Sequence, residues 1–182
     1  LLVLKITDNC NLSCKYCYNE GDYGSIKMEI ATRAIDSALE ACCEGVSLIL
    51  HGGEPLLEFQ KIQKIVNYAE LKARELSKKV LFSIQTNATM LSDVMIEFIK
   101  QHSIGIGISF DGLEEINDKL RIWSNHSGSS KQILKGIDLL KKHGLSVNIL
   151  TVVTKLNSRR LPEIVLNLQK LGCKSVKFSY FF

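Results

Sequence analysis

Residues 10–18 read CNLSCKYCY and hold Cys10, Cys14 and Cys17, half of the six cysteines of the chain. The spacing C-x3-C-x2-C puts three thiols on one short loop, whereas zinc and [4Fe–4S] sites usually take four ligands. With three cysteines, one iron of a [4Fe–4S] cluster stays open to a ligand from outside the chain. We therefore predict a [4Fe–4S] cluster on these three residues. The alternatives are a zinc site completed by His51 and three thiols that bind no metal.

The composition is that of an ordinary globular protein. Of 182 residues, 46% are hydrophobic and 23% are charged, which predicts one domain. The net charge of +4 has no block of like charges and gives no case for nucleic acid or a membrane surface. No apolar run approaches the ~20 residues of a membrane span. A cytoplasmic setting therefore fits, and in that setting clustered cysteines favour a metal site over disulfides. We predict a cytoplasmic protein without nucleic-acid or membrane partners.

Short β-type runs alternate with amphipathic stretches along the whole chain. The β-type runs are 1–7, 46–50, 80–85, 104–110, 145–153 and 175–181, and the amphipathic stretches are 28–43, 58–78, 91–101, 130–143 and 160–171. This alternation predicts an α/β fold with a parallel sheet and right-handed crossovers. Six strands are too few for a closed eight-stranded barrel, so the prediction is a partial (βα)6 parallel barrel. Both chain ends fall inside apolar runs, so we expect residues 1–182 to be one core domain and a fragment of a longer chain.

Each of the first four β-type runs ends in chemically unusual residues. The first runs into the cysteine loop, the second into HGGEP, the third into QTN and the fourth into SFDG. In parallel βα barrels the active residues gather at the carboxyl ends of the strands. We therefore expect the functional site at that end of the predicted sheet.

The cysteine loop resembles that of radical S-adenosylmethionine (SAM) enzymes, whose pattern is C-x3-C-x-aromatic-C. In that family the amino and carboxylate groups of the methionine moiety bind the open iron. The resemblance implies two cofactors, a [4Fe–4S] cluster and S-adenosylmethionine, on a radical SAM core. It also implies that Tyr16, in the aromatic position, lies against the adenine; the alternative is a core tyrosine.

Two further motifs carry the resemblance. HGGEPLL resembles the family segment that holds the cofactor amino group, which implies contacts from Gly52, Gly53 and Glu54. Glycines let backbone groups approach a ligand closely, although a simple strand-to-helix turn is the alternative. QTNATML resembles the third-strand segment and makes Gln85 a candidate for contacting cofactor or substrate. A polar network inside the barrel is the other explanation for Gln85.

The fourth run extends the resemblance. ISFDG resembles the family's ribose- and carboxylate-binding strand, which implies that Ser109 lies near the cofactor. Asp111 is the weaker candidate, because Asp-Gly is also common turn chemistry. Arg121 ends the segment NDKLR and matches an arginine that related enzymes use for the cofactor carboxylate, a task suited to its forked geometry. The alternative is a surface arginine. The remaining cysteines lack ligand spacing, and we expect them to be small buried residues: Cys42, Cys43 and Cys173.

The resemblance is to the peptide- and protein-modifying subgroup, which includes anaerobic sulfatase-maturating enzymes and maturases of ribosomal peptides. It implies an enzyme that reductively cleaves S-adenosylmethionine, forms a 5′-deoxyadenosyl radical and modifies a peptide or protein side chain. The implied partners are that substrate and a reductant such as flavodoxin or ferredoxin. The alternatives are a radical activase or small-molecule enzyme of the same superfamily, and a non-catalytic iron–sulfur electron-transfer module.

Overall fold

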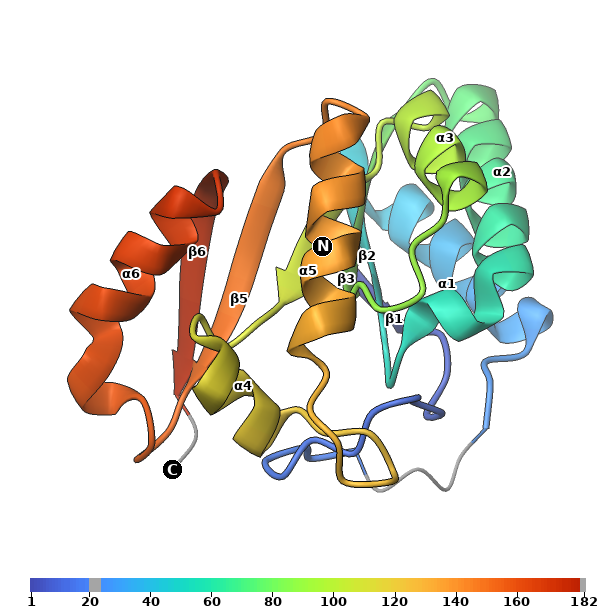
Figure 1. Cartoon of the computed structure of the whole chain (residues 1–182). Helices are drawn as coiled ribbons and strands as arrows, with labels where there is room; N and C mark the ends of the chain where they lie inside the picture. The colour runs from blue at the N-terminus through green and yellow to red at the C-terminus, as the bar shows by residue number, and fades with distance from the viewer. Residues whose placement is uncertain (20–23, 181–182) are drawn as a thin grey trace. The chain divides into compact units, whose positions relative to one another are not determined.

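The computed structural model describes residues 1–19 and 24–180. The strands within this range are β1 (Leu2–Lys5), β2 (Gly45–His51), β3 (Lys79–Thr86), β4 (Gly105–Ser109), β5 (Val147–Val153) and β6 (Cys173–Tyr180). The helices are α1 (Met28–Ala41), α2 (Phe59–Glu75), α3 (Asp93–Gln101), α4 (Glu114–Leu120), α5 (Ser130–Lys142) and α6 (Leu161–Lys170), with short 3-10 helices η1 (Pro55–Glu58) and η2 (Ser158–Arg160) (Figure 1).

The elements confirm the predicted alternation of strands and helices. Every predicted strand and helix is present, with bounds shifted by a few residues. The predicted end of the last strand, residue 181, lies outside the described residues. The sequence analysis missed α4, whose seven residues are too few to show a helical period. Among the described residues, no helix combines the length and apolarity needed to cross a membrane.

The chain divides into two compact units, and the prediction of one core domain stays a prediction. The first unit comprises Leu1–Cys10, Asn19–Gln85 and Glu97–Gly105. Its strands β1 and β2 pair in parallel, as do β2 and β3. Leu4, Leu48 and other alternate residues of these strands are buried on the face against which α1 packs. The opposite face carries more polar residues, including His51 at the end of β2.

The second unit comprises Asn11–Tyr18, Thr86–Ile96 and Ile106–Phe182. Within it β4 pairs with β5 and β5 with β6, all in parallel, as the predicted α/β fold requires. Helix α5 packs on β5 and α6 on β6, and Figure 1 shows α6 running along β6. Ile108 and Ile149 lie side by side in the register and are almost fully buried, which marks the helix-covered face of this part of the sheet.

Candidate cofactor-binding site

The cysteine loop has chemistry suited to a soft metal centre. Cys17 N–H donates to Cys14 O at 3.0 Å, which turns the chain tightly between these two cysteines. Cys10 and Cys17 are exposed, Cys14 is half-buried, and no disulfide forms among the described residues. Thiolates are the usual ligands of iron–sulfur clusters. In the described part of the chain no three His, Cys, Asp or Glu residues are already gathered as metal ligands, so the cluster stays a prediction.

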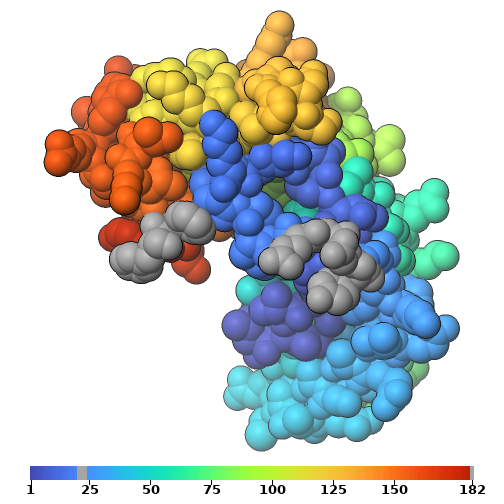
Figure 2. All heavy atoms as spheres, turned by 90° about the horizontal axis from the view of Figure 1, so that it is seen from below, coloured from blue at the N-terminus to red at the C-terminus, as the bar shows by residue number. Residues whose placement is uncertain are grey.

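Backbone hydrogen bonds hold the loop against the last residue of α4 and the segment that follows it. Ser13 N–H donates to Ile122 O at 2.7 Å, and Lys15 N–H donates to Leu120 O at 2.9 Å. Leu12 and Trp123 form an antiparallel bridge beside these bonds. Figure 2 shows the blue atoms of the loop against the gold atoms of this segment. The second unit therefore supports the loop from Leu12 to Lys15 through its own backbone.

A ring of side-chain hydrogen bonds fixes the start of the loop. Asn87 Nδ2 donates to Asn11 Oδ1 at 2.8 Å, and Asn11 Nδ2 donates to Thr89 Oγ1 at 2.8 Å. Thr89 Oγ1 in turn donates to Asn87 Oδ1 at 2.7 Å. Asn87 and Thr89 lie just after the end of β3. Their hydrogen bonds therefore hold Asn11, the residue that follows Cys10, beside this segment.

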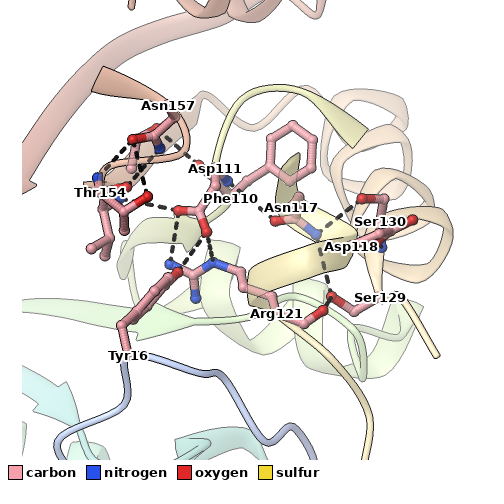
Figure 3. A network of polar contacts seen from close by, with 12 residues as sticks. Tyr16, Phe110, Asp111, Asn117, Asp118, Arg121, Ser129, Ser130, Thr154 and Asn157 are labelled. Atoms are coloured by element: carbon pink, nitrogen blue, oxygen red, sulfur yellow. Dashed lines mark hydrogen bonds and ion pairs between the residues drawn. The ribbon is translucent and has the colours of Figure 1, made fainter. Parts of the chain in front are cut away.

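Tyr16, Asp111 and Arg121 form a compact group at the other end of the loop (Figure 3). Tyr16 Oη donates to Asp111 Oδ2 at 2.6 Å. Arg121 Nε lies 3.2 Å from Asp111 Oδ2, and its Nη2 lies 3.4 Å from Oδ1. The guanidinium carbon of Arg121 is 5.3 Å from the centroid of the Tyr16 ring, a cation–π distance. The side chain between Cys14 and Cys17 is thus tied to a buried ion pair.

Burial and neighbouring charges set the protonation states of Tyr16 and Arg121. Burial raises the pKa of Tyr16, and the Asp111 carboxylate raises it further against the opposing charge of Arg121. Burial would lower the pKa of Arg121, but the charge of Asp111, together with smaller contributions from Tyr16, Cys14 and the hydrogen bond to Asp111, raises it above the usual value. Tyr16 is therefore a neutral donor, and Arg121 stays a cation throughout the physiological pH range.

Asp111 is the residue that the sequence analysis undervalued. Its side chain is fully buried, and its Oδ1 also accepts Val152 N–H at 3.1 Å. Its backbone N–H donates to Asn117 Oδ1 at 3.2 Å, and Asn117 Nδ2 donates to Ser130 Oγ at 2.9 Å. The signal that could have found it is its position two residues beyond Ser109, on the small-residue face of the fourth strand. A simple turn aspartate would be exposed instead.

Arg121 is buried, which rules out the alternative of a surface arginine: only 6% of its surface is exposed. Its Nε lies close enough to Asp111 for an ion pair, yet no described residue accepts a hydrogen bond from it. A buried donor without an aligned acceptor costs free energy. The guanidinium therefore fits the predicted role of binding a carboxylate, while Asp111 already supplies part of its counter-charge.

The two glycines after β2 let two chain segments approach closely. Gly53 N–H donates to Thr7 O at 2.7 Å, and Gly52 has a positive φ of 151°. A Cβ on Gly52 would lie 2.4 Å from Thr7 O, and one on Gly53 would lie 2.2 Å from Asn9 O. The two glycines were expected to let the backbone approach a ligand. In the structure they let it approach the backbone of Thr7 and Asn9, just before Cys10.

Glu54 and His51 flank the glycines. Glu54 is fully buried, and its Oε1 accepts Leu56 N–H at 3.0 Å at the start of η1. His51 is half-buried, and its Nδ1 accepts Gly52 N–H at 2.7 Å. Burial, with a smaller contribution from the charge of Lys5, lowers the pKa of His51. Both side chains therefore stabilise the turn, and the predicted cofactor role of Glu54 stays a prediction.

The other predicted cofactor residues also follow strand ends. Gln85 is the half-buried next-to-last residue of β3, and Ser109 is the half-buried last residue of β4, opposite Leu150. Of the predicted set, the second unit brings Tyr16 and Arg121 together and also contains Ser109. The first unit contains Gln85 and the predicted amino-group segment at 52–54.

The three cysteines outside the loop differ from expectation. Cys43 is exposed, while Cys42 and Cys173 are half-buried, so none of them is a fully buried core residue. Cys42 and Cys43 follow the end of α1, and Cys173 is the first residue of β6. They remain separate from the loop in sequence and serve as controls for its chemistry.

Comparison with known sequences confirms the family resemblance. The sequence profile of the Radical SAM superfamily matches residues 4–168. The chain is 40% identical over 178 residues to the uncharacterized protein MJ0907 of Methanocaldococcus jannaschii, covering 97% of this chain and 61% of that protein. It is 30% identical over 187 residues to the cysteine-type anaerobic sulfatase-maturating enzyme of Clostridium novyi, covering 98% and 50%. The chain thus spans about half to three-fifths of the length of these relatives.

Solved structures match over the whole chain. A structure described as native anSMEcpe with bound AdoMet and Kp18Cys peptide superposes with a TM-score of 0.91 at 24% identity, covering 100% of this chain and 51% of that one. Streptococcus suis SuiB bound to the precursor peptide SuiA matches with a TM-score of 0.74 at 21% identity, covering 100% and 39%. At these identities the likeness establishes the fold alone, and it confirms the predicted α/β class.

Proposed function

Because the chain belongs to the radical SAM superfamily, we propose that it is the core of an enzyme that reductively cleaves S-adenosylmethionine and modifies a peptide or protein side chain. The observation that carries the proposal is the C-x3-C-x2-C loop whose Tyr16 is locked to the buried pair of Asp111 and Arg121. This arrangement joins the part of the loop that carries Cys14 and Cys17 to a cation for an anionic ligand in the second unit.

The residues divide the task of holding the two cofactors. Cys10, Cys14 and Cys17 would ligate a [4Fe–4S] cluster, which when bound supplies the electron for cleavage and leaves one iron for S-adenosylmethionine. Arg121 would hold the methionine carboxylate, because its Nε lacks an aligned acceptor among the described residues. Tyr16 would face the adenine as a neutral phenol, which adds no charge beside the cofactor.

The remaining predicted residues would orient the cofactor. Gly52, Gly53 and Glu54 would form the amino-group side, where the buried carboxylate of Glu54 can face an ammonium group. Ser109 and Gln85 would contact the cofactor from the ends of β4 and β3. The tight packing of Gly53 on Asn9 keeps this segment in a fixed position relative to Cys10.

Relatives and structural neighbours support a peptide as the substrate. Two neighbours are described with bound peptides, and one relative is a sulfatase-maturating enzyme. We propose a peptide or protein substrate for this chain, a reductant such as flavodoxin or ferredoxin, and a cytoplasmic location. The competing function within the superfamily is a radical activase or an enzyme of small molecules. A non-catalytic electron-transfer module is the competing function of another class.

Anaerobic reconstitution tests the proposal. We expect about four irons per chain in the reconstituted protein, and 5′-deoxyadenosine on addition of S-adenosylmethionine and dithionite. The cofactor should also change the paramagnetic resonance spectrum of the reduced cluster. A variant with Ala at Cys10, Cys14 and Cys17 should lose iron and product.

The matched control carries Ala at Cys42, Cys43 and Cys173, which should keep both iron and product. Zinc in place of iron would contradict the cluster. A stable cluster that never yields 5′-deoxyadenosine would instead support the electron-transfer module. Peptide modification is read separately, as a mass change in a candidate substrate.

A further inference from the structure

A cross-strand row in the second unit puts a lysine on the same line as a predicted cofactor residue. Ser109 of β4 lies opposite Leu150 of β5, and Leu150 lies opposite Lys177 of β6. All three strands are parallel and belong to one unit, so the row follows from the register alone. Lys177 has no role in the cofactor site described above.

The three residues share one face of the sheet. Side chains alternate along a strand, and the neighbouring row of Ile108 and Ile149 is buried on the opposite, helix-covered face. Ser175 Oγ donates to Asn148 Oδ1 at 2.8 Å, two residues before Lys177 and Leu150 on their own strands. That bond confirms that β5 and β6 present these alternate side chains on the same side.

Lys177 is the one charged residue among the side chains of β4, β5 and β6 that share this face within the second unit. The others are uncharged: Gly107, Ser109, Asn148, Leu150, Val152, Ser175 and Ser179. Lys177 is exposed, and no carboxylate of the described residues forms an ion pair with it. Asp111 follows β4 on the same face, but its carboxylate already contacts Arg121 and Tyr16. Among the described residues no carboxylate therefore neutralises Lys177, and its ammonium group can bind an external anion.

The distances suit a ligand that lies between Ser109 and Lys177. Adjacent strands lie about 4.8 Å apart, so two steps separate the backbones by roughly 10 Å. A lysine side chain reaches roughly 6 Å from its Cα and can lay its aliphatic stem along Leu150. The ammonium group therefore comes within reach of a substrate that occupies the space beside a cofactor at Ser109.

We propose that Lys177 binds a carboxylate of the peptide substrate, supplied by an Asp or Glu residue close to the side chain that is modified. This rests on the proposed function, in which Ser109 lies beside the cofactor. The cofactor carboxylate is assigned to Arg121, which leaves Lys177 for the substrate. Lysine suits this task, because its compact charge and flexible stem accept a carboxylate from several directions.

Fluorescein-labelled hexaglutamate is a probe that does not require the natural substrate. Its affinity for the reconstituted protein is measured by anisotropy with S-adenosylmethionine present. Lys177→Met should weaken binding about tenfold or more, the value of one charge-assisted hydrogen bond. Lys177→Arg should keep the affinity within about threefold.

Lys170→Met is the matched control, because it removes the same charge from the exposed end of α6, on the helix that covers the other face of β6. It should leave the affinity unchanged, and labelled hexaglutamine should bind no variant. If Lys177→Met binds hexaglutamate as the unmodified protein does, Lys177 is only a charge on a strand at the sheet edge, and the proposal is wrong. Absence of hexaglutamate binding to the unmodified protein would overturn it equally.

A second measurement separates this proposal from the function on which it rests. Lys177→Met should form 5′-deoxyadenosine without substrate at the unmodified rate and bind S-adenosylmethionine normally. Loss of cofactor affinity in this variant would assign the carboxylate to the cofactor and overturn the proposal. If hexaglutamate binding depends on Lys177 but the protein never cleaves S-adenosylmethionine, the result supports the binding site and contradicts the proposed function.

Discussion

Tyr16 Oη and Asp111 Oδ2 are 2.6 Å apart although 95 residues separate them in the sequence. The bond joins the stretch between Cys14 and Cys17 to the residues just beyond β4. Asp111 accepts it while also facing Arg121 and Val152 N–H, so one buried carboxylate connects the loop, α4 and β5. Protein contacts therefore fix the conformation of the loop around Tyr16, so this part of the loop does not depend on a bound cluster for its conformation.

Removing the Tyr16 hydroxyl should weaken this connection. Tyr16→Phe should lower the free energy of unfolding of the apoprotein by about 1–2 kcal/mol, because a buried charged acceptor loses one hydrogen bond. Anaerobic urea titration measures the change. Tyr68→Phe is the control, since Tyr68 Oη donates to Asp36 at 2.8 Å at the surface, and it should cost less. Equal losses in the two variants would contradict a special role for the buried bond.

Arg121 and Asp111 should depend on each other. Arg121→Met leaves the Asp111 carboxylate buried without a counter-charge, which should cost about 3–5 kcal/mol. The double variant Asp111→Asn/Arg121→Met should recover part of this loss. Urea titrations of both single variants and the double variant give the coupling energy, for which about 0.5–3 kcal/mol is expected. Strictly additive losses would mean that the two groups do not interact.

The same variants separate stability from cofactor binding. The double variant should still lack affinity for S-adenosylmethionine, because the guanidinium is absent even where stability returns. Its cluster should remain, as judged by iron content. Arg160→Met, which removes a half-buried arginine paired with Glu163 at 2.7 Å and Glu115 at 2.9 Å, should leave the cluster and the affinity for S-adenosylmethionine unchanged.

The fold was largely predictable because its signal is local. The alternation of apolar runs and amphipathic stretches depends on neighbours in the sequence, and β2 and α5 lie within a residue or two of their predicted ranges. Helix α4 escaped detection because seven residues give fewer than two full turns. The alternation carries no information on the division into two units, which depends on contacts between distant segments.

The candidate site was predictable only where a short motif carried it. The cysteine spacing and GGEP are contiguous, so sequence alone indicated them. The value of Asp111 depends on contacts with Tyr16 and Arg121 that no local pattern encodes. The hydrogen-bonded ring of Asn11, Asn87 and Thr89 could not be predicted either, because Asn11 is distant in sequence from the other two.

Gly53 should be intolerant of any side chain. A Cβ there would lie 2.2 Å from Asn9 O, a backbone atom that cannot yield as a flexible side chain does. Gly53→Ala should therefore lower the free energy of unfolding by about 3 kcal/mol, the upper end of the usual range for overpacking. Displacement of Asn9 should also disturb Cys10, so iron content after reconstitution should fall.

Gly144→Ala is the comparison for Gly53→Ala. Gly144, unlike Gly53, has a positive φ of 73°, and nothing lies within 4 Å of a Cβ placed there. Gly144→Ala should therefore lower the free energy of unfolding only by the backbone strain of about 1 kcal/mol. The iron content should stay unchanged. Thermal unfolding and iron analysis of the two variants provide the test. An iron loss as large in Gly144→Ala would point to general instability as its cause.

His51 should make the first unit sensitive to acid. Its Nδ1 accepts Gly52 N–H at 2.7 Å, which requires an unprotonated nitrogen. Burial lowers its pKa in the folded state below the unfolded value of about 6.5. Between these two pKa values the unfolded chain binds more protons, so the free energy of unfolding rises with pH. The contribution of His51 is therefore fully present above about pH 7 and is lost as the pH falls from about 6.5 toward the folded pKa.

His51→Asn isolates this contribution from that of the other three histidines. The Asn amide oxygen can accept Gly52 N–H where Nδ1 does, but it does not titrate. Urea titrations from pH 7.5 to 5.5 should show that the unmodified protein loses more stability than the variant on acidification. The affinity for S-adenosylmethionine should fall over the same pH range in the unmodified protein, because Gly52 is the first residue of the predicted amino-group segment. Identical pH profiles for the two proteins would show that His51 does not titrate in this window, and a steeper loss in the variant would reverse the sign of the predicted linkage.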